Sequence, residues 1–177
     1  MDVSIAEKKL REARFFLDHM RVQEGRAAGD REVYDFFLSA FLSASRSVLL
    51  RLEEARGPFA KVFLPWRKTV WGRGLPRPER KAANRLVEFF ATERNLEVHR
   101  GGARRVERET SIPVHSSYSD RSGNYFVYSP PDAPPAELIV PEYYVTIRGV
   151  ERKATEACAE YLGLLDRMVA TFKADHP

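Results

Sequence analysis

The sequence predicts a mainly α protein: an antiparallel bundle of four to five helices with a small antiparallel β insert before the last helix. Three observations lead to this prediction. Apolar residues recur every three or four positions in four separate segments. The segment at about 103–149 is instead rich in β-branched and aromatic residues. The length of 177 residues suits one domain, which we assign to residues 1–177.

Two helices are expected in the first third of the chain. The first spans residues 3–28 and ends at a glycine-containing turn, and the second spans 31–56 and ends at Gly57-Pro58. The short connection between them favours antiparallel neighbours. Their apolar stripes are Ala6, Leu10, Ala13, Leu17 and Met20 in the first helix, and Tyr34, Phe37, Leu38, Phe41, Ser45, Val48, Leu49 and Leu52 in the second.

The next segment, residues 58–78, is compatible with a short helix or with a packed loop. Pro78 is well placed as the first residue of a further helix that runs to about residue 99. Gly101-Gly102 end that helix. A last helix is expected at 150–174, with an apolar face that includes Cys158.

The β insert is expected between these two helices. Two groups of β-forming residues, 112–128 and 138–147, flank the proline-rich segment 130–135. Proline cannot pair within a central strand, so the proline-rich segment predicts a loop between strands. The paired aromatics Tyr125–Tyr128 and Tyr143-Tyr144 could stack nucleic-acid bases, although a half-buried sheet face is the favoured interpretation.

Positive charge is concentrated in the middle of the chain. The net charge is +4, but residues 58–108 carry thirteen Lys or Arg against five acids, whereas residues 109–177 carry six against ten. A clustered basic excess suggests a polyanionic partner. The alternative is a solvated basic surface that binds nothing specific.

Several classes of protein are not supported. The single cysteine, Cys158, permits no internal disulfide, and none of the four histidines is spaced as a metal ligand, so we expect no metal and no cofactor. No uninterrupted apolar run reaches the roughly 18 residues of a membrane span. The N-terminus is too charged for a signal peptide, so a cytoplasmic location without membrane contact is expected.

One short motif has plausible chemistry. The chain lacks a phosphate-binding glycine loop, a nucleophile elbow and a zinc-protease helix motif. It has Arg94-Asn95-x-x-x-His99 at the end of the predicted third long helix. The same loose Arg-to-His spacing occurs at Arg14–His19 and Arg108–His115, but only the Arg94 motif has the Asn, the preceding apolar helix and the Gly-Gly stop.

This motif resembles the signature of the HEPN superfamily, in which an Arg followed by a polar residue precedes a His by four to six positions. Residues 34–48 also resemble the second helix of a bacterial branch of that family, and Trp66 and the motif follow in the order that branch shows. The resemblance covers about residues 5–102 and excludes the β insert. Gly101 stands where toxin members paired with a nucleotidyltransferase have Tyr.

The resemblance implies a homodimeric, metal-independent endoribonuclease. Arg94, Asn95 and His99 would be the catalytic residues, and Arg100, Arg104, Arg105 and Arg108 would bind RNA phosphates. An antitoxin or another protein partner is a further expectation. A histidine near neutral pKa can move the proton of a ribose 2′-OH, and a guanidinium can hold the scissile phosphate.

Two alternatives remain at this point. On an ideal helix Arg94 and His99 lie about 140° apart, so they converge only if the last turn frays or a second subunit contributes. Arg94 could instead pair with a nearby acid while His99 caps the helix end. The chain would then be a non-catalytic interaction module, or a nucleotide binder with a pocket that one nucleotide fills.

Overall fold

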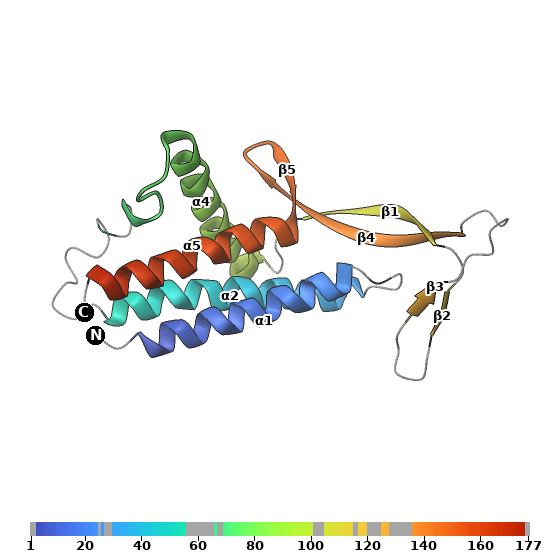
Figure 1. Ribbon diagram of the computed structural model, residues 1–177, viewed down its shortest axis with the longest axis horizontal. Coiled ribbons are helices and arrows are strands. Elements are labelled where there is room, and N and C mark those ends of the chain that lie inside the picture. Colours follow the sequence, from blue (N-terminus) through green and yellow to red (C-terminus); the bar gives the residue numbers. More distant parts are fainter. Residues whose placement is uncertain are drawn as a thin grey trace.

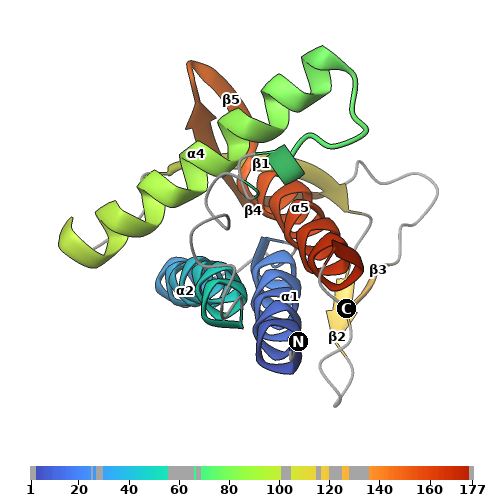
Figure 2. The same ribbon diagram turned by 90° about the vertical axis from the view of Figure 1, so that its left-hand side faces the viewer.

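A computed structural model describes residues 3–24, 26, 30–55, 66, 69–100, 105–114, 117–119, 125–127 and 136–175. These ranges contain four long helices: α1 (Ser4–Glu24), α2 (Arg31–Ala55), α4 (Arg77–Arg100) and α5 (Ala154–Asp175). α1, α2 and α5 lie side by side along the long axis with α1 antiparallel to the other two, and α4 crosses them (Figures 1 and 2). The predicted helical fold, with an antiparallel sheet before the last helix, is confirmed.

The apolar stripes form the core between these helices. All five predicted core residues of α1 are buried, and most of the α2 stripe is buried as well. The α2 helix begins where Asp30 accepts hydrogen bonds from the backbone N–H groups of Glu32 (2.8 Å) and Val33 (3.2 Å). This is the N-cap arrangement, which satisfies two otherwise unpaired donors of the first turn. Sequence periodicity and capping therefore agree for this part of the fold.

The β insert forms one three-stranded sheet and one small pair of strands. β1 (Val106–Val114), β4 (Ala136–Ile147) and β5 (Val150–Lys153) are antiparallel in the order β1-β4-β5, and β2 (Ser117–Ser119) pairs with β3 (Tyr125–Val127). Figure 1 shows β1 and β4 leaving the helical body together as an arm. Because Val106 pairs with Tyr144, the start of β1 lies at the end of the arm nearest the helices.

The start of the last helix differs from the expectation. Residues 150–153 were expected to be helical, but they form β5, and α5 begins at Ala154. The cause is the two-residue turn before them, in which Arg148 (φ 50°) and Gly149 (φ 82°) both have positive φ. Two positive φ values are typical of a tight hairpin turn, which folds Val150–Lys153 back onto β4.

Among the described helices, α2 is the one with the length and apolar composition that a membrane span requires. Residues Arg31–Glu54 of α2 are long and apolar enough by length and composition, although they include charged residues and serines. Within the fold, 44% of the most apolar 18-residue stretch of this helix is buried. The packing of α2 against α1, α4 and α5 gives these apolar side chains a role in the core.

Candidate functional site

The Arg94-Asn95-x-x-x-His99 motif lies on the last two turns of α4. The helix continues through Arg100, so the backbone at His99 is helical rather than frayed. Consecutive helical residues rotate by about 100°, which leaves Arg94 and His99 about 140° apart around the axis. The side chains of residues 94–100 lie outside the described part of the structure. The helical backbone therefore removes the frayed-turn route to convergence within one chain.

Of the four arginines expected to bind RNA, Arg105 has a well-defined place in the fold. Its side chain is 4% exposed, and its Nε and Nη2 donate to the two carboxylate oxygens of Asp35 at 2.5 and 2.6 Å. The guanidinium also lies over the Tyr143 ring at 4.6 Å from the centroid. Burial opposes the charge, but the hydrogen bond and charge of Asp35 outweigh it, so the pKa of Arg105 is raised. A buried guanidinium that is engaged on both sides is not available to a phosphate.

Arg108 remains at the surface. It forms an exposed ion pair with Glu151 and lies 5.1 Å over the Tyr144 ring. Exposed pairs of this kind are weak, so a phosphate could displace the carboxylate. The side chain of Arg100 and all of Arg104 lie outside the described residues.

Two of the sheet aromatics noted in the sequence, Tyr143 and Tyr144, have described side chains. Tyr143 is fully buried and stacks on Tyr34 with ring centroids 3.7 Å apart. Tyr144 is half-buried and donates its hydroxyl to Glu142. The side chains of Tyr125–Val127 and all of Tyr128 lie outside the described residues. For Tyr143 the sheet-face interpretation therefore agrees with its burial.

A buried acid completes this packing layer. Glu24 is 7% exposed and accepts hydrogen bonds from the hydroxyls of Thr155 (2.7 Å) and Tyr34 (3.3 Å). Burial raises the pKa of Glu24 above its usual value, against the opposing effect of these hydrogen bonds and of Lys153. The cluster joins α1, α2 and α5 beneath the sheet and has the features of a structural network.

Other candidate residues occupy ordinary positions. Cys158 is buried, and burial raises the pKa of its thiol. The Arg14–His19 pair, which has the same loose Arg-to-His spacing, lies on α1. Arg14 pairs there with Asp166 at 2.7 Å, and His19 packs between Phe15 and Phe37. Within the described ranges, no group of three His, Cys, Asp or Glu side chains is arranged to hold a metal ion.

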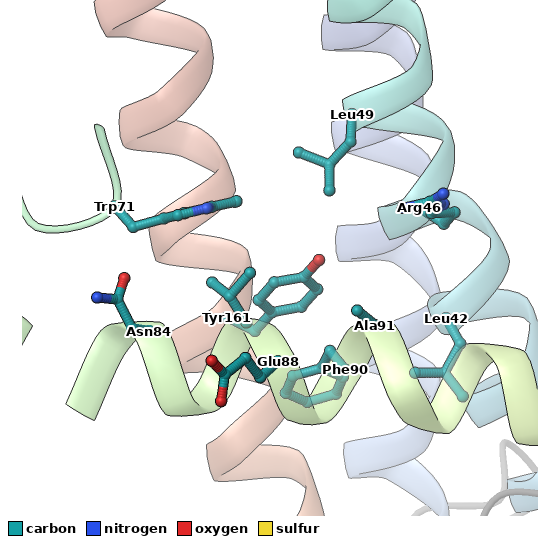
Figure 3. Close-up of a pocket in the computed structure, with 10 residues that line it drawn as sticks. Leu42, Arg46, Leu49, Trp71, Asn84, Glu88, Phe90, Ala91 and Tyr161 are labelled. Atoms are coloured by element: carbon teal, nitrogen blue, oxygen red, sulfur yellow. The ribbon is translucent and has the colours of Figure 1, made fainter. Parts of the chain in front are cut away.

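A pocket that the sequence did not reveal lies between α2, α4 and α5. Its volume is about 460 Å³, and its walls include the rings of Trp71, Phe90 and Tyr161. Phe90 and Tyr161 are stacked, with centroids 4.4 Å apart and an interplanar angle of 6°. Figure 3 shows the Tyr161 ring between the helices, with Trp71 on one side and Arg46 on the other. The pocket is of a size that accommodates a small organic ligand.

Two glycines set the position of the Trp71 wall. Trp71 begins a turn, residues 71–74, just before α4. A Cβ on Gly72 would lie 2.0 Å from the side chain of Arg80, and Gly74 has a positive φ of 76°. Glycine is therefore required for the turn to lie against the first turns of α4.

Polar side chains from two helices line the same pocket. They are Arg46 on α2 and Asn84 and Glu88 on α4. Glu88 pairs with Arg148 at 2.7 Å in an exposed contact. Among the described residues, no carboxylate lies within ion-pair distance of Arg46, and that side chain is half-buried. The pocket thus combines aromatic walls with a cation, an amide and a carboxylate.

The pocket and the motif share one face of α4. Asn84, Glu88 and Ala91 line the pocket, and Asn95 follows Ala91 at the next four-residue step. Residues spaced by three and four lie on one side of a helix, so the backbone positions of Asn95 and His99 continue the pocket-lining side. Arg94 follows the pocket residue Val87 by seven positions and continues the adjacent row. This common face was not predicted, because it depends on how α2 and α5 pack against α4.

Comparisons with known proteins add no relative. No protein-family model matches the chain, and neither the curated proteins nor the solved structures contain a significant match.

Proposed function

We propose that this chain is a metal-independent endoribonuclease of the HEPN type that acts as a homodimer. The observation that supports this function best is the position of Arg94, Asn95 and His99 on the last two turns of a regular helix, where the backbone positions of Asn95 and His99 continue the side that lines a pocket. In this proposal His99 is the acid–base group, Arg94 is the phosphate-binding cation, and the pocket holds an RNA base close to the cleaved bond.

The proposed reaction is a transesterification within the RNA strand. The imidazole of His99 takes the proton of a ribose 2′-OH, and the 2′-oxygen attacks the adjacent phosphorus. The bond to the 5′-oxygen breaks, and that oxygen receives a proton from an imidazolium. The products are a 2′,3′-cyclic phosphate and a 5′-OH, so DNA is not a substrate.

Arg94 and Asn95 act on the phosphate in this proposal. The Arg94 guanidinium presents donors in a planar fork that suits two phosphate oxygens and offsets the charge that develops in the transition state. Asn95 orients the phosphate or the imidazole through its amide. Each contribution is made at the reacting centre, so the loss of either should lower the rate more than it lowers RNA binding.

A second protomer is part of the same proposal. Because Arg94 and His99 lie about 140° apart on α4, one helix does not bring them to the same point. Two helices related by a twofold axis can place the Arg94 of one chain beside the His99 of the other. The active unit is therefore a dimer with two equivalent composite sites.

Flanking RNA phosphates would be bound by Arg100, Arg104 and Arg108. We do not include Arg105 in this set, because its guanidinium is buried against Asp35 and Tyr143. Each contact between one of these cations and a phosphate makes the RNA affinity fall more steeply as the salt concentration rises. We propose a cytoplasmic location for this reaction, since the apolar side chains of α2 contribute to the helical core.

A non-catalytic interaction module is the second candidate. It is favoured by the wide angle between Arg94 and His99 on α4 and by the β1–β4 arm, on which Val106 and Ile139 are 43% and 54% exposed. In that case the helical body would dimerise, and the arm would recruit an antitoxin or another protein. This module would bind its partner equally well without His99.

Single-turnover cleavage of RNA in the presence of a chelator tests the first proposal. We expect His99→Ala and Arg94→Ala to reduce the rate at least 100-fold, the effect usual for loss of a general acid–base or transition-state contact. His19→Ala on α1 and Arg85→Ala on α4 are controls of the same residue types and should keep the wild-type rate. Equal rates in all five proteins would exclude the nuclease and leave the interaction module.

A further inference from the structure

We infer that the pocket between α2, α4 and α5 binds one unstacked base of single-stranded RNA together with its phosphate. This inference depends on the proposed function, because it identifies a substrate subsite beside the same motif. It starts from the pocket of about 460 Å³, which is lined by Trp71, Phe90 and Tyr161. A nucleobase is a planar ring of suitable size, and aromatic side chains bind such rings by stacking.

The aromatic wall is held firmly before any ligand arrives. Phe90 and Tyr161 stack on each other at 4.4 Å, and Trp71 lies at 6.5 Å from Tyr161 with the ring planes tilted by 33°. All three side chains are at most 6% exposed, so they belong to the core as well as to the pocket. A rigid wall costs little conformational entropy when it binds a ligand, which favours affinity.

Two of the three polar side chains of the pocket match the remaining parts of a nucleotide, and the third, Glu88, is exposed and pairs with Arg148. Arg46 is a half-buried cation, and no described carboxylate pairs with it, so its guanidinium can donate hydrogen bonds to a phosphate. Asn84 carries an amide that can both donate to and accept from a base edge. These groups come from α2 and α4, so a ligand that contacts both spans the pocket.

The position of the pocket along α4 connects it to the motif. Ala91 lines the pocket, and His99 follows it by eight residues, a rise of about 12 Å along the helix axis. A strand with one base in the pocket would have a neighbouring phosphate near the end of α4. The pocket would then select a base close to the cleaved bond, which gives the nuclease a sequence preference.

Tryptophan fluorescence tests binding without reference to cleavage. The chain has two tryptophans, and Trp66 lies elsewhere, where it donates to Asp175 and packs on Phe172. A Trp66→Phe protein therefore reports on Trp71 alone. We expect saturable quenching by short single-stranded RNA and weaker quenching by nucleoside monophosphates. Ribose 5-phosphate, which lacks a base, should have no effect.

Substitutions identify the groups that bind. In the Trp66→Phe background, Arg46→Gln and Asn84→Ala should each weaken RNA binding about tenfold, with the Arg46 change removing the advantage of a nucleotide over a nucleoside. Arg51→Gln, which changes the same charge on an exposed side chain of the same helix, should bind like the parent. Folding of each variant is checked by circular dichroism.

The outcomes separate this inference from the proposed nuclease. Quenching that survives in His99→Ala, with no cleavage in the wild type, would support the pocket and exclude the nuclease. Cleavage without saturable quenching, and with an unchanged sequence preference in Arg46→Gln, would exclude the pocket alone. Tighter binding of a free mononucleotide than of RNA would also overturn the inference, because the ligand would then be a nucleotide rather than a strand.

Discussion

The Arg105 guanidinium and the Asp35 carboxylate, 70 positions apart in the chain, form two parallel hydrogen bonds of 2.5 and 2.6 Å. Arg105 immediately precedes β1, and Asp35 lies on the second turn of α2. Their contact therefore fixes the root of the β arm to the helical body. Arg105 also follows the last residue of α4, Arg100, by only five positions in the chain.

Removal of Asp35 should destabilise the fold. Arg105 is 4% exposed, so Asp35→Ala would leave a buried cation without its main partner. Loss of one partner of a buried ion pair costs about 3–5 kcal/mol, and the 47% exposure of Asp35 reduces this to about 2 kcal/mol. Urea denaturation monitored by circular dichroism measures the change in the free energy of unfolding.

Arg108→Ala is the matched control for this prediction. It also removes one partner of an arginine–carboxylate contact at the sheet, but both side chains of that pair are about half exposed. We expect a change of less than about 0.5 kcal/mol. If the two substitutions had equal effects, the Arg105–Asp35 contact would not anchor the arm.

The helices were predictable because their signals are local. The stripe from Ala6 to Met20 repeats at helical spacing, and Asp30 stands directly before α2, so neighbouring residues alone determine both features. The hairpin between β4 and β5 was missed for the opposite reason. Its turn is Arg148-Gly149 rather than an Asn-Gly pair, and Arg rarely adopts positive φ, so no local signal separated β5 from the helix that follows.

This turn predicts a stabilising substitution. Arg148 has a φ of 50°, a conformation that asparagine tolerates better than arginine. Arg148→Asn should therefore raise the stability by about 0.5 kcal/mol, since the exposed contact with Glu88 that it removes contributes little. Thermal unfolding would detect this as an increase in the melting temperature of about 1–2 °C.

The opposite change belongs in the same measurement. Gly149 has a φ of 82°, so Gly149→Ala should lower the melting temperature, at a cost of about 1 kcal/mol. If Arg148→Asn were destabilising while Gly149→Ala had no effect, the positive-φ turn would not be the feature that separates β5 from α5.

Glu142 predicts a dependence of stability on acid pH. Hydrogen bonds from Tyr144, Lys153 and Thr110 lower the pKa of Glu142 to about 2. The folded-state pKa thus lies below the unfolded value near 4.5. The stabilisation is fully present above about pH 4.5 and is lost as the pH falls towards 2.

Glu142→Gln should therefore be less stable than the wild type at pH 6, and the difference should become smaller by pH 3. Urea denaturation at several pH values measures it. Glu109→Gln, on the neighbouring strand, is the control and should follow the wild-type curve. A difference that stays constant across this range would mean that the three hydrogen bonds do not stabilise the ionised carboxylate.

The candidate site was only partly predictable. Arg94, Asn95 and His99 are adjacent in sequence, so a pattern can identify them and place them at a helix end. The role of Arg105 depends on Asp35 and Tyr143, which lie 70 residues before it and 38 residues after it. The pocket likewise needs Arg46, Asn84 and Tyr161 from three helices. Charge clustering marked the arginines as a group and could not distinguish the buried one from the exposed ones.

The proposed composite site makes a prediction about mixed dimers. If the His99 of one protomer acts with the Arg94 of its partner, a dimer of one His99→Ala chain and one Arg94→Ala chain has one dead site, which lacks both residues, and one complete site. Neither pure variant has a complete site. Mixing the two inactive proteins under conditions that exchange subunits should therefore restore activity.

The size of the recovery follows from statistics. Random exchange of equal amounts makes half of the dimers mixed, and each mixed dimer has one of two sites intact, so about one quarter of the wild-type rate should return. A mixture of His99→Ala with a double His99→Ala/Arg94→Ala protein is the control and should stay inactive. If Arg94 and His99 act within one chain, the first mixture also stays inactive, because every protomer then lacks one of the two groups. That result, with active wild-type protein, would exclude the composite site and keep the nuclease.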